Sequence, residues 1–206
     1  MPTPAPEIDD VGKTHASPSA PGAPPPATLG ESRHTTVLPA IEWQGDQPRL
    51  VTNNRSRFEE LGELGRGGMG EVVLAKDHDI DRTVALKKLP PGSDVAQVLR
   101  FVEEVRAVGK LEHPNIVPVH DVGIDVDGRF FFVMKHLGGE TLDAVIKKMR
   151  AGDAATRERF SRPVRMQVLL GVMHAVGYAH RQGFVHRDLK PANIMIGPFG
   201  EVTVVD

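Results

Sequence analysis

The stretch His-Arg-Asp-Leu-Lys-Pro-Ala-Asn, residues 186–193, decides how the rest of the sequence is interpreted. A run of helical composition precedes it and predicts a helix over residues 163–182. Two short apolar runs follow it, and their length predicts strands at residues 194–196 and 202–205. Asp206 comes directly after the second run. We therefore expect the charged stretch to connect a long helix to a pair of short strands.

A second informative segment is glycine-rich. Residues 65–72 read Gly-Arg-Gly-Gly-Met-Gly-Glu-Val and contain the spacing G-x-G-x-x-G, which lets backbone N–H groups approach phosphate oxygens without interference from Cβ atoms. A dinucleotide-binding fold uses the same spacing, but its third glycine opens a helix. Residues 71–75 instead alternate like a strand. This favours a strand–loop–strand flap, and a plain hairpin turn without a ligand stays open from this segment alone.

The other expected elements follow from apolar spacing. A cap at Ser93-Asp94 and apolar residues at three- and four-residue intervals predict a helix that ends before His113-Pro114. A further helix is expected at residues 141–150. The expected strands of the first half cover residues 61–65, 71–75, 83–89, 116–122 and 129–134.

Lys87 lies on the strand expected at residues 83–89, beside the flap. If its ammonium is buried it needs a carboxylate, and the following helix offers Glu103 and Glu104. Glu104 borders the apolar stripe of that helix, whereas Glu103 lies further toward solvent, so we predict the pair Lys87–Glu104. In the alternative, Lys88 is the inward lysine and both glutamates are solvated. Strand alternation between Ala85 and Lys87 argues against it.

Taken together, these segments resemble the protein kinase domain, and in particular the bacterial eukaryotic-like serine/threonine protein kinases. Residues 186–193 match H-R-D-L-x-x-x-N at every fixed position, and Lys190-Pro191 resembles the serine/threonine class. The resemblance covers residues 58–206 and includes His-Pro-Asn-Ile-Val at residues 113–117. It implies an α+β, protein kinase-like fold. An antiparallel β N-lobe with one helix would be followed by a mainly helical C-lobe, incomplete because the sequence stops at Asp206.

The resemblance also implies roles for single residues. Asp188 would accept or orient the proton of the substrate hydroxyl, and Lys190 would neutralise charge on the transferred phosphoryl group. Lys87 and Glu104 complete the implied catalytic set, and Asn193 and Asp206 would bind Mg²⁺. His186 is expected to be a structural hydrogen-bonding residue.

The hinge between the lobes resembles Phe-Val-Met-Lys-His-Leu, residues 132–137, with Met134 as the gatekeeper. The backbone of Lys135 and Leu137 would bond adenine, with Val72 and Ala85 on either side of the ring. The implied nucleotide-binding residues are Leu64, Gly65, Arg66, Gly67, Gly68, Met69, Gly70, Val72, Ala85, Lys87, Met134, Lys135 and Leu137.

The function expected from this resemblance is transfer of the ATP γ-phosphate to serine or threonine hydroxyls of a protein, with ATP and Mg²⁺ required. Because the sequence stops at Asp206, we expect no appreciable transfer by this chain alone. The alternative is a module that binds nucleotide or a partner without catalysis. A pseudokinase is disfavoured because Lys87, Asp188, Asn193 and Asp206 are all present, and a dinucleotide-dependent oxidoreductase is disfavoured by the strand after the glycines.

Composition adds limits. The 25 basic residues are balanced by 27 acidic ones among 206, and no basic stripe indicates nucleic acid as a partner. Cysteine is absent, which excludes disulfides and cysteine nucleophiles and fits a reducing cytoplasm. No signal peptide or membrane segment is expected in this chain. Anchoring of the full-length protein through a later segment stays open.

We expect three regions. Ten of the 17 prolines fall before Leu50, where large apolar residues are scarce, so residues 1–55 are expected to be mostly disordered. Within them, residues 37–43 could dock on the domain, although a solvated linker is favoured. Residues 56–137 are expected to form the N-lobe and hinge, and residues 138–206 a partial C-lobe without the activation segment and later helices.

Overall fold

The structure, a computed structural model, describes residues 35–51, 55–67 and 70–205. All of these belong to one compact unit, Ser32–Asp206. Three of the expected site residues, Gly68, Met69 and Asp206, lie outside the described residues, as do residues 1–34 of the expected disordered region.

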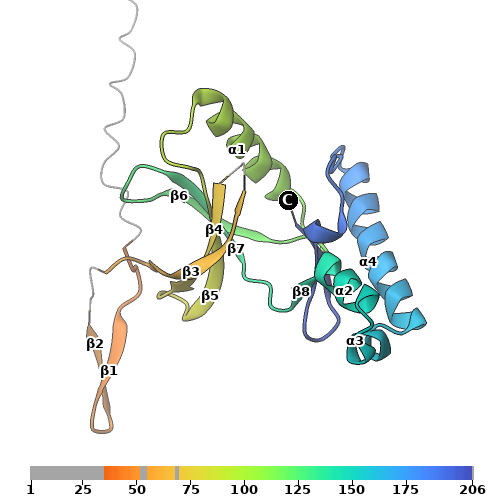
Figure 1. The fold of residues 1–206 in the computed structure, drawn as a ribbon. Helices are drawn as coiled ribbons and strands as arrows, with labels where there is room; N and C mark the ends of the chain where they lie inside the picture. Colours follow the sequence, from red (N-terminus) through yellow and green to blue (C-terminus); the bar gives the residue numbers. More distant parts are fainter. Residues whose placement is uncertain (1–34, 52–54, 68–69, 206) are drawn as a thin grey trace, which may run out of the picture. The chain divides into compact units, whose positions relative to one another are not determined.

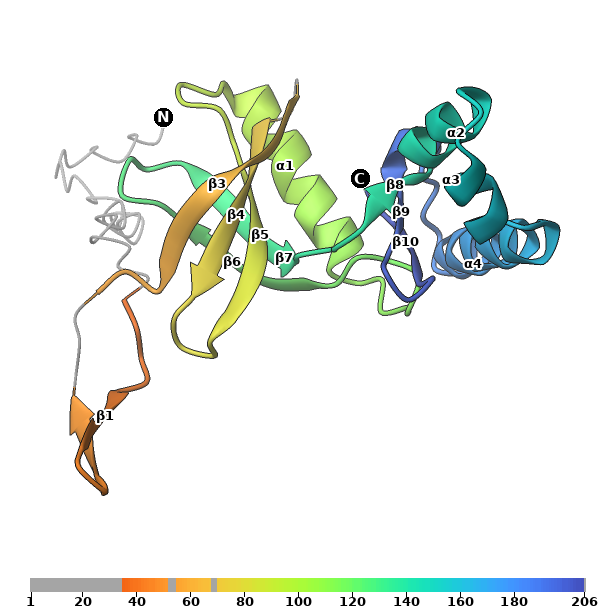
Figure 2. The ribbon, with the colours of Figure 1, turned by 60° about the horizontal axis from the view of Figure 1, so that its bottom comes forward.

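A five-stranded antiparallel sheet forms the first half of this unit (Figures 1 and 2). Its spatial order is β3-β4-β5-β7-β6. The strands are β3 (Phe58–Gly67), β4 (Gly70–Asp77), β5 (Arg82–Lys88), β6 (Val119–Ile124) and β7 (Phe130–Lys135). The sequence placed a strand near each of these positions, and the antiparallel sheet it predicted is confirmed.

The one helix expected in this half is α1 (Val95–Val108). Asp94 begins it as expected: its carboxylate accepts the N–H of Gln97, and the Gln97 side chain accepts the N–H of Asp94, which completes a capping box. The helix ends at Gly109, earlier than the apolar spacing predicted. Leu111 lies beyond its end and packs against the core of the second half.

Side-chain alternation divides the sheet into two faces with different cores. On the face that meets α1, Leu89 and Phe132 pack against Phe101 of the helix. On the other face, a separate apolar cluster is made of Phe58, Val73, Ala75, Val84, Leu86, Phe131 and Val133.

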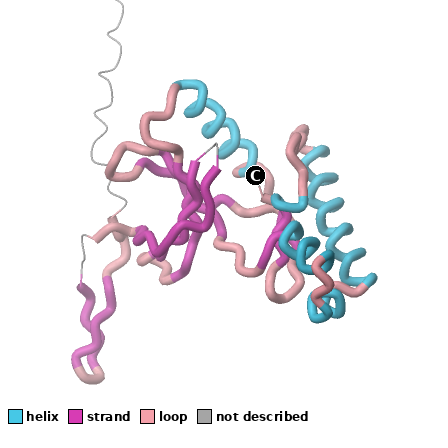
Figure 3. The backbone as a smooth tube through the Cα atoms, in the orientation of Figure 1, coloured by secondary structure: helices cyan, strands magenta, loops and turns pink. Residues whose placement is uncertain are grey.

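The second half combines helices with a small antiparallel sheet of order β10-β9-β8. Figure 3 shows that its helices gather around these short strands, whereas α1 accompanies the large sheet. The elements are β8 (Glu140–Thr141), α2 (Leu142–Arg150), α3 (Ala154–Arg159), α4 (Arg162–Arg181), η1 (Pro191–Asn193), β9 (Ile194–Ile196) and β10 (Val202–Val204). Helices α2 and α4 and strands β9 and β10 were predicted; β8 and α3 are too short to give a periodic signal.

The two halves are joined by backbone bonds at a place where the sequence predicted a single strand over residues 116–122. Strand β6 begins only at Val119, after Pro118, which has no N–H to donate to a ladder. Ile116 instead forms a parallel bridge with Val204. The N–H of Val117 donates to Val204 O at 3.1 Å, and the N–H of Val204 donates to Asn115 O at 2.8 Å.

Disorder to residue 55 does not hold for the described part of that region. A hairpin of β1 (Ala40–Gln44) and β2 (Gln47–Val51) turns at Gly45, whose φ of +60° suits glycine. Before it, the carboxylate of Asp79 accepts the N–H groups of Val37 and Leu38, so the start of segment 37–43 contacts the domain while the rest joins the exposed hairpin. The hairpin was missed because its strands pair with each other while its apolar side chains, such as Ile41, Trp43 and Leu50, stay exposed.

Among the described residues, none of the helices combines the length and apolarity that a bilayer crossing requires.

Candidate active site

The expected phosphate-side residues line one cleft of about 520 Å³. The glycine-rich hairpin formed by β3 and β4 supplies its first wall, and β5 and α1 supply charged side chains behind it. The segment between α4 and η1 supplies the rest. The lining residues are Gly65, Arg66, Gly67, Gly70, Val72, Lys87, Glu104, His186, Asp188, Lys190 and Asn193.

The glycines of this hairpin differ in what they require. Gly70, the first residue of β4, has φ +128°, and a Cβ there would lie 2.0 Å from the carbonyl oxygen of Lys88. This position therefore accepts glycine alone. A Cβ on Gly65 or Gly67 would meet nothing within 4 Å. These two positions therefore leave open space beside the cleft, as approach of a phosphate to the backbone would need.

Lys87 and Glu104 form the expected pair. The ammonium Nζ lies 2.6 Å from Glu104 Oε1, and the side chains are only 7% and 13% exposed. Lys87 lies opposite Val72 in the register, on the face of the sheet that meets α1. Burial of the two charges together leaves the ammonium fixed at the wall of the cleft.

Lys88 is also buried, at 3% exposure, but on the opposite face of the sheet. Its ammonium contacts Glu60 and lies 3.2 Å from Asp125. The alternative in which Lys88 replaces Lys87 at the site is therefore wrong. Both faces of this sheet are covered, so both lysines are buried, one on each face.

The loop after α4 holds three of the expected residues within hydrogen-bond distance of each other. Lys190 Nζ lies 2.6 Å from Asp188 Oδ2, and Asn193 Nδ2 donates to the backbone oxygen of Asp188 at 3.0 Å. Arg187 has φ +63°, a left-handed conformation that is uncommon for a residue other than glycine. This backbone state turns the chain between His186 and Asp188, and no residue type in the segment predicts it.

The Asp188 carboxylate is exposed and poised to remain ionised. The hydrogen bond from Lys190 lowers its pKa below the ordinary value, and the smaller desolvation effect acts in the opposite direction. The Asn193 amide adds to the lowering at 3.3 Å from Oδ2. An ionised, accessible carboxylate can accept a hydrogen bond from a hydroxyl group that enters the cleft.

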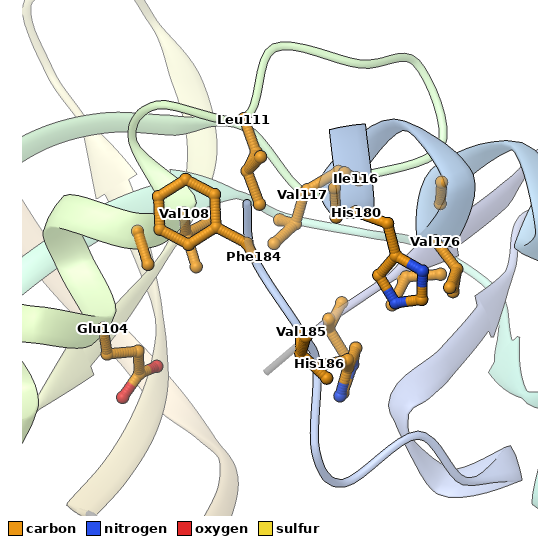
Figure 4. A pocket seen from close by; sticks show the side chains of 15 residues that line it. Glu104, Val108, Leu111, Ile116, Val117, Val176, His180, Phe184, Val185 and His186 are labelled. Atoms are coloured by element: carbon orange, nitrogen blue, oxygen red, sulfur yellow. The ribbon is translucent and has the colours of Figure 1, made fainter. Parts of the chain in front are cut away.

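Behind the cleft lies an apolar cavity of about 170 Å³, between α1 and α4 (Figure 4). Glu104 and His186 border both the cleft and this cavity. Glu104 Oε2 and His186 Nε2 are buried and have no hydrogen-bond partner among the described residues. His186, expected to be structural, does place its Nδ1 3.4 Å from the N–H of Asp188, but its lining of the cleft was missed.

The residues expected to surround adenine are not in the lining of this cleft, except for Val72. Ala85 is buried opposite Met134 in the register, on the same face as Lys87. The N–H of Lys135 donates to Pro118 O at 3.2 Å. Leu64 is half exposed near the end of β3, and Leu137 follows β7.

The side chains of the cleft suit a Mg²⁺ ion that takes most of its ligands from a bound phosphate compound and water and only a few from the protein. Among the described residues, no cluster of three or more histidine, aspartate or glutamate side chains could hold a metal ion. Asn193, 8% exposed, offers one oxygen beside Asp188. Mg²⁺ commonly takes one or two protein ligands and completes its shell with phosphates and water.

Comparison with known proteins gives one family. Residues 58–206 match the family described as "Protein kinase domain". The chain is 36% identical over 157 residues to the serine/threonine-protein kinase PknD of Protochlamydia amoebophila, covering 72% of this chain and 16% of that protein. It is 39% identical over 158 residues to the probable serine/threonine-protein kinase PknB of Bifidobacterium longum, covering 71% of this chain and 22% of that protein. The chain thus spans less than a quarter of the length of these relatives.

Proposed function

Because the chain belongs to the protein kinase domain family, we propose that it carries the nucleotide-binding and phosphate-transfer groups of a serine/threonine protein kinase. Its substrates would be ATP, with Mg²⁺, and the hydroxyl groups of a protein. A cytoplasmic place of action, where ATP is available, fits the absence of cysteine. The observation that supports this proposal best is a single cleft beside the glycine-rich hairpin, which is lined by Lys87, Asp188, Lys190 and Asn193.

In the proposed reaction, ATP supplies the phosphoryl group and Mg²⁺ neutralises charge on its phosphates. Lys87, held by Glu104 at the wall of the cleft, would bind phosphate oxygens through its positively charged ammonium. The backbone at Gly65 and Gly67 would approach the same phosphates from the opposite wall.

Asp188 would orient the attacking hydroxyl. Its ionised carboxylate can accept the hydroxyl proton, and the adjacent Lys190 ammonium can stabilise negative charge that develops on the phosphoryl oxygens. Asn193 would hold Asp188 in place through the bond to its backbone oxygen, and would also offer its amide oxygen to Mg²⁺.

Nucleotide binding tests the first half of this proposal. We expect the 206-residue chain to bind ATP with Mg²⁺ by isothermal titration calorimetry. Lys87→Met should weaken binding about tenfold or more, because a charge-assisted hydrogen bond to phosphate is lost. Lys147→Met, which removes an exposed lysine of α2, is the matched control and should leave the affinity unchanged.

Asp188→Asn separates binding from chemistry. Asp188 is assigned to the hydroxyl substrate and not to the nucleotide, so this variant should retain ATP affinity. Failure of the unaltered chain to bind ATP would overturn the proposed function. ATP binding without transfer of labelled phosphate to serine or threonine, assayed in a longer chain that continues past Asp206, would favour the non-catalytic alternative.

A further inference from the structure

A connected set of ion pairs covers the face of the large sheet that lies away from α1. We call it the outer ion-pair network. It starts at Arg66 in the glycine-rich hairpin and ends at Lys88 on β5. Lys88 is also the residue whose carbonyl group packs against Gly70. Its members are Glu60, Glu63, Arg66, Glu71, Lys88, Asp125 and Arg129.

The network begins within the glycine motif itself. Arg66 lies opposite Glu71 in the strand register, and its guanidinium lies 2.7 Å from Glu71 Oε2 and 2.9 Å from Glu63 Oε2. Although Arg66 also borders the cleft, its guanidinium is engaged with these two carboxylates. The side chain thus links the two strands of the hairpin to each other.

The network then crosses to the turn between β6 and β7. The other oxygen of Glu71 accepts from Arg129 Nη1 at 2.8 Å, and Arg129 Nε donates to Asp125 at 2.8 Å. Asp125 also accepts the backbone N–H of Arg129 and contacts the buried ammonium of Lys88. Side chains in this middle part are 3–18% exposed, so solvent screens them far less than an ordinary surface pair.

The pKa shifts of Asp125 and Arg129 both favour the charged forms that their ion pair requires. Burial alone would raise the pKa of Asp125, but bonds from the Arg129 backbone and from Lys88 outweigh it and lower that pKa. Burial likewise acts to lower the pKa of Arg129, and Asp125 and Glu71 reverse the effect. Both groups therefore stay charged over the physiological pH range.

We propose that Glu71 and Arg129, neither of which lines the cleft, are positioning residues that hold the glycine-rich hairpin at the height where its backbone meets nucleotide phosphates. The inference rests on the proposed function. Gly70 fixes the hairpin at the start of β4 by packing on the Lys88 carbonyl. The Glu71–Arg129 pair fixes it from the opposite face, through side chains that a nucleotide would never touch.

Comparison of ATP with adenosine isolates this effect, because adenosine lacks the phosphates. The unaltered chain and Glu71→Gln are titrated with each ligand in the presence of Mg²⁺. We expect Glu71→Gln to weaken ATP binding about two- to tenfold and to leave adenosine binding unchanged. Arg129→Met should act in the same direction, and the milder Glu71→Gln covers the case in which Arg129→Met does not fold.

The matched control is Asp121→Asn. Like Glu71, Asp121 is a carboxylate that accepts from a largely buried arginine, here Arg57, but this arginine is bonded to Asp77, at the end of β4 away from the glycines. It should change neither affinity. Equal losses for ATP and adenosine in Glu71→Gln, or unchanged ATP affinity, would overturn the positioning role.

Hydrogen exchange measured without nucleotide distinguishes this failure from failure of the proposed function. Glu71→Gln should raise backbone exchange in β3 and β4 near residues 62–74 and leave β6 unaffected. If the chain binds no ATP yet exchange rises as stated, the proposed function fails and the ordering role stands. If exchange in the hairpin does not change, the positioning role fails.

Discussion

Lys87 and Lys88 are neighbours in the chain, and both are buried, yet they serve opposite faces of one sheet. Each is neutralised by its own carboxylates: Glu104 for Lys87, and Glu60 with Asp125 for Lys88. A period-2 backbone and two covered faces are enough to produce this separation. The pair with Glu104 then becomes the more consequential, because Lys87 reaches the cleft.

Glu104→Gln tests how much the Lys87 pair contributes to stability. The amide can still accept a hydrogen bond but no longer carries the negative charge that faces the buried ammonium, so the free energy of unfolding should fall by about 1–3 kcal/mol. Chemical denaturation followed by circular dichroism measures it. Glu103→Gln changes an exposed neighbour on the same helix and should have no effect; similar losses in both variants would contradict the pairing argument.

Lys190→Met tests the electrostatic link at the loop. Lys190 is the main cause of the lowered pKa of Asp188, so without it that pKa should rise toward its ordinary value. A titration of the Asp188 carboxyl carbon by NMR would show a higher midpoint. Lys190→Arg keeps the charge and should preserve the low midpoint, and an unchanged midpoint in Lys190→Met would refute the assigned cause.

At this scale the sequence predicted what depends on spacing. Strand alternation and helix faces were enough to choose Lys87 and Glu104. Burial of Lys88 was missed because it depends on Asp125 and Glu60, which are far apart in the chain and meet only after the sheet forms. The left-handed Arg187 was missed because its residue type carries no preference for that conformation.

Among the elements, the glycine-rich hairpin has the most unequal requirements. Gly70 needs both its positive φ and its missing side chain, whereas Gly65 needs neither for folding. The motif therefore combines one glycine that strand packing requires with others that leave open space beside the cleft.

Gly70→Ala should destabilise the chain by about 2–4 kcal/mol, since a Cβ would collide with the Lys88 backbone at an unfavourable φ. Gly65→Ala, in the same motif, should cost less than about 1 kcal/mol. Thermal unfolding of the two variants provides the comparison. Equal destabilisation would contradict the argument that the close contact between Gly70 and the Lys88 backbone sets the requirement for glycine.

Helix α4 leaves part of its apolar surface uncovered by the other described residues. Met166, Leu169, Leu170 and Met173 are each about half exposed, although Val168, Val172 and Ala175 are buried. Exposed apolar surface of this kind promotes association.

Replacing Leu170 and Met173 together by glutamine should reduce self-association, because both side chains meet solvent in the chain as described. Analytical ultracentrifugation and binding of a hydrophobic dye would both show the decrease. The unfolding midpoint should stay nearly constant. A large fall in that midpoint would show instead that these residues stabilise the fold.

Element prediction succeeded where a pattern was long. The predictions of helix α1 and of the five-stranded sheet rest on repeated apolar spacing, and that of α4 on a long run of helical composition. Asp94 supplied a cap that is visible in the sequence. Strand β8, helix α3 and the β1–β2 hairpin are short, and the hairpin buries almost nothing. Whether these short elements form depends on contacts with other segments, which the composition of the elements themselves does not predict.

For the molecule as a whole, acid stability should follow the Asp77 carboxylate. Its side chain is fully buried and paired with Arg57 at 2.9 Å. Burial alone would raise the pKa of Asp77, but the Arg57 bonds and the backbone N–H of Asp79 outweigh it and lower the pKa. A carboxyl whose folded pKa is lowered stabilises the fold above its unfolded pKa, and this contribution disappears as pH falls through the folded value.

Asp77→Asn should therefore reduce the free energy of unfolding by about 2–4 kcal/mol at neutral pH. The difference from the unaltered chain should begin to shrink near the unfolded-state pKa of about 4 and should disappear as pH falls through the lower pKa of the folded carboxyl. Denaturation curves at several pH values measure both effects. A difference that stays constant down to pH 2 would contradict the pairing.

The same contact bears on where this protein can safely be shortened. The family match starts at Phe58, one position after Arg57. A version trimmed to that family boundary would keep Asp77 and delete the cation that neutralises it, together with the N–H groups of Val37 and Leu38 that Asp79 accepts. The working unit of folding thus begins well upstream of the sequence signature, and expression of the trimmed version would yield a product with an unmatched negative charge inside its first sheet.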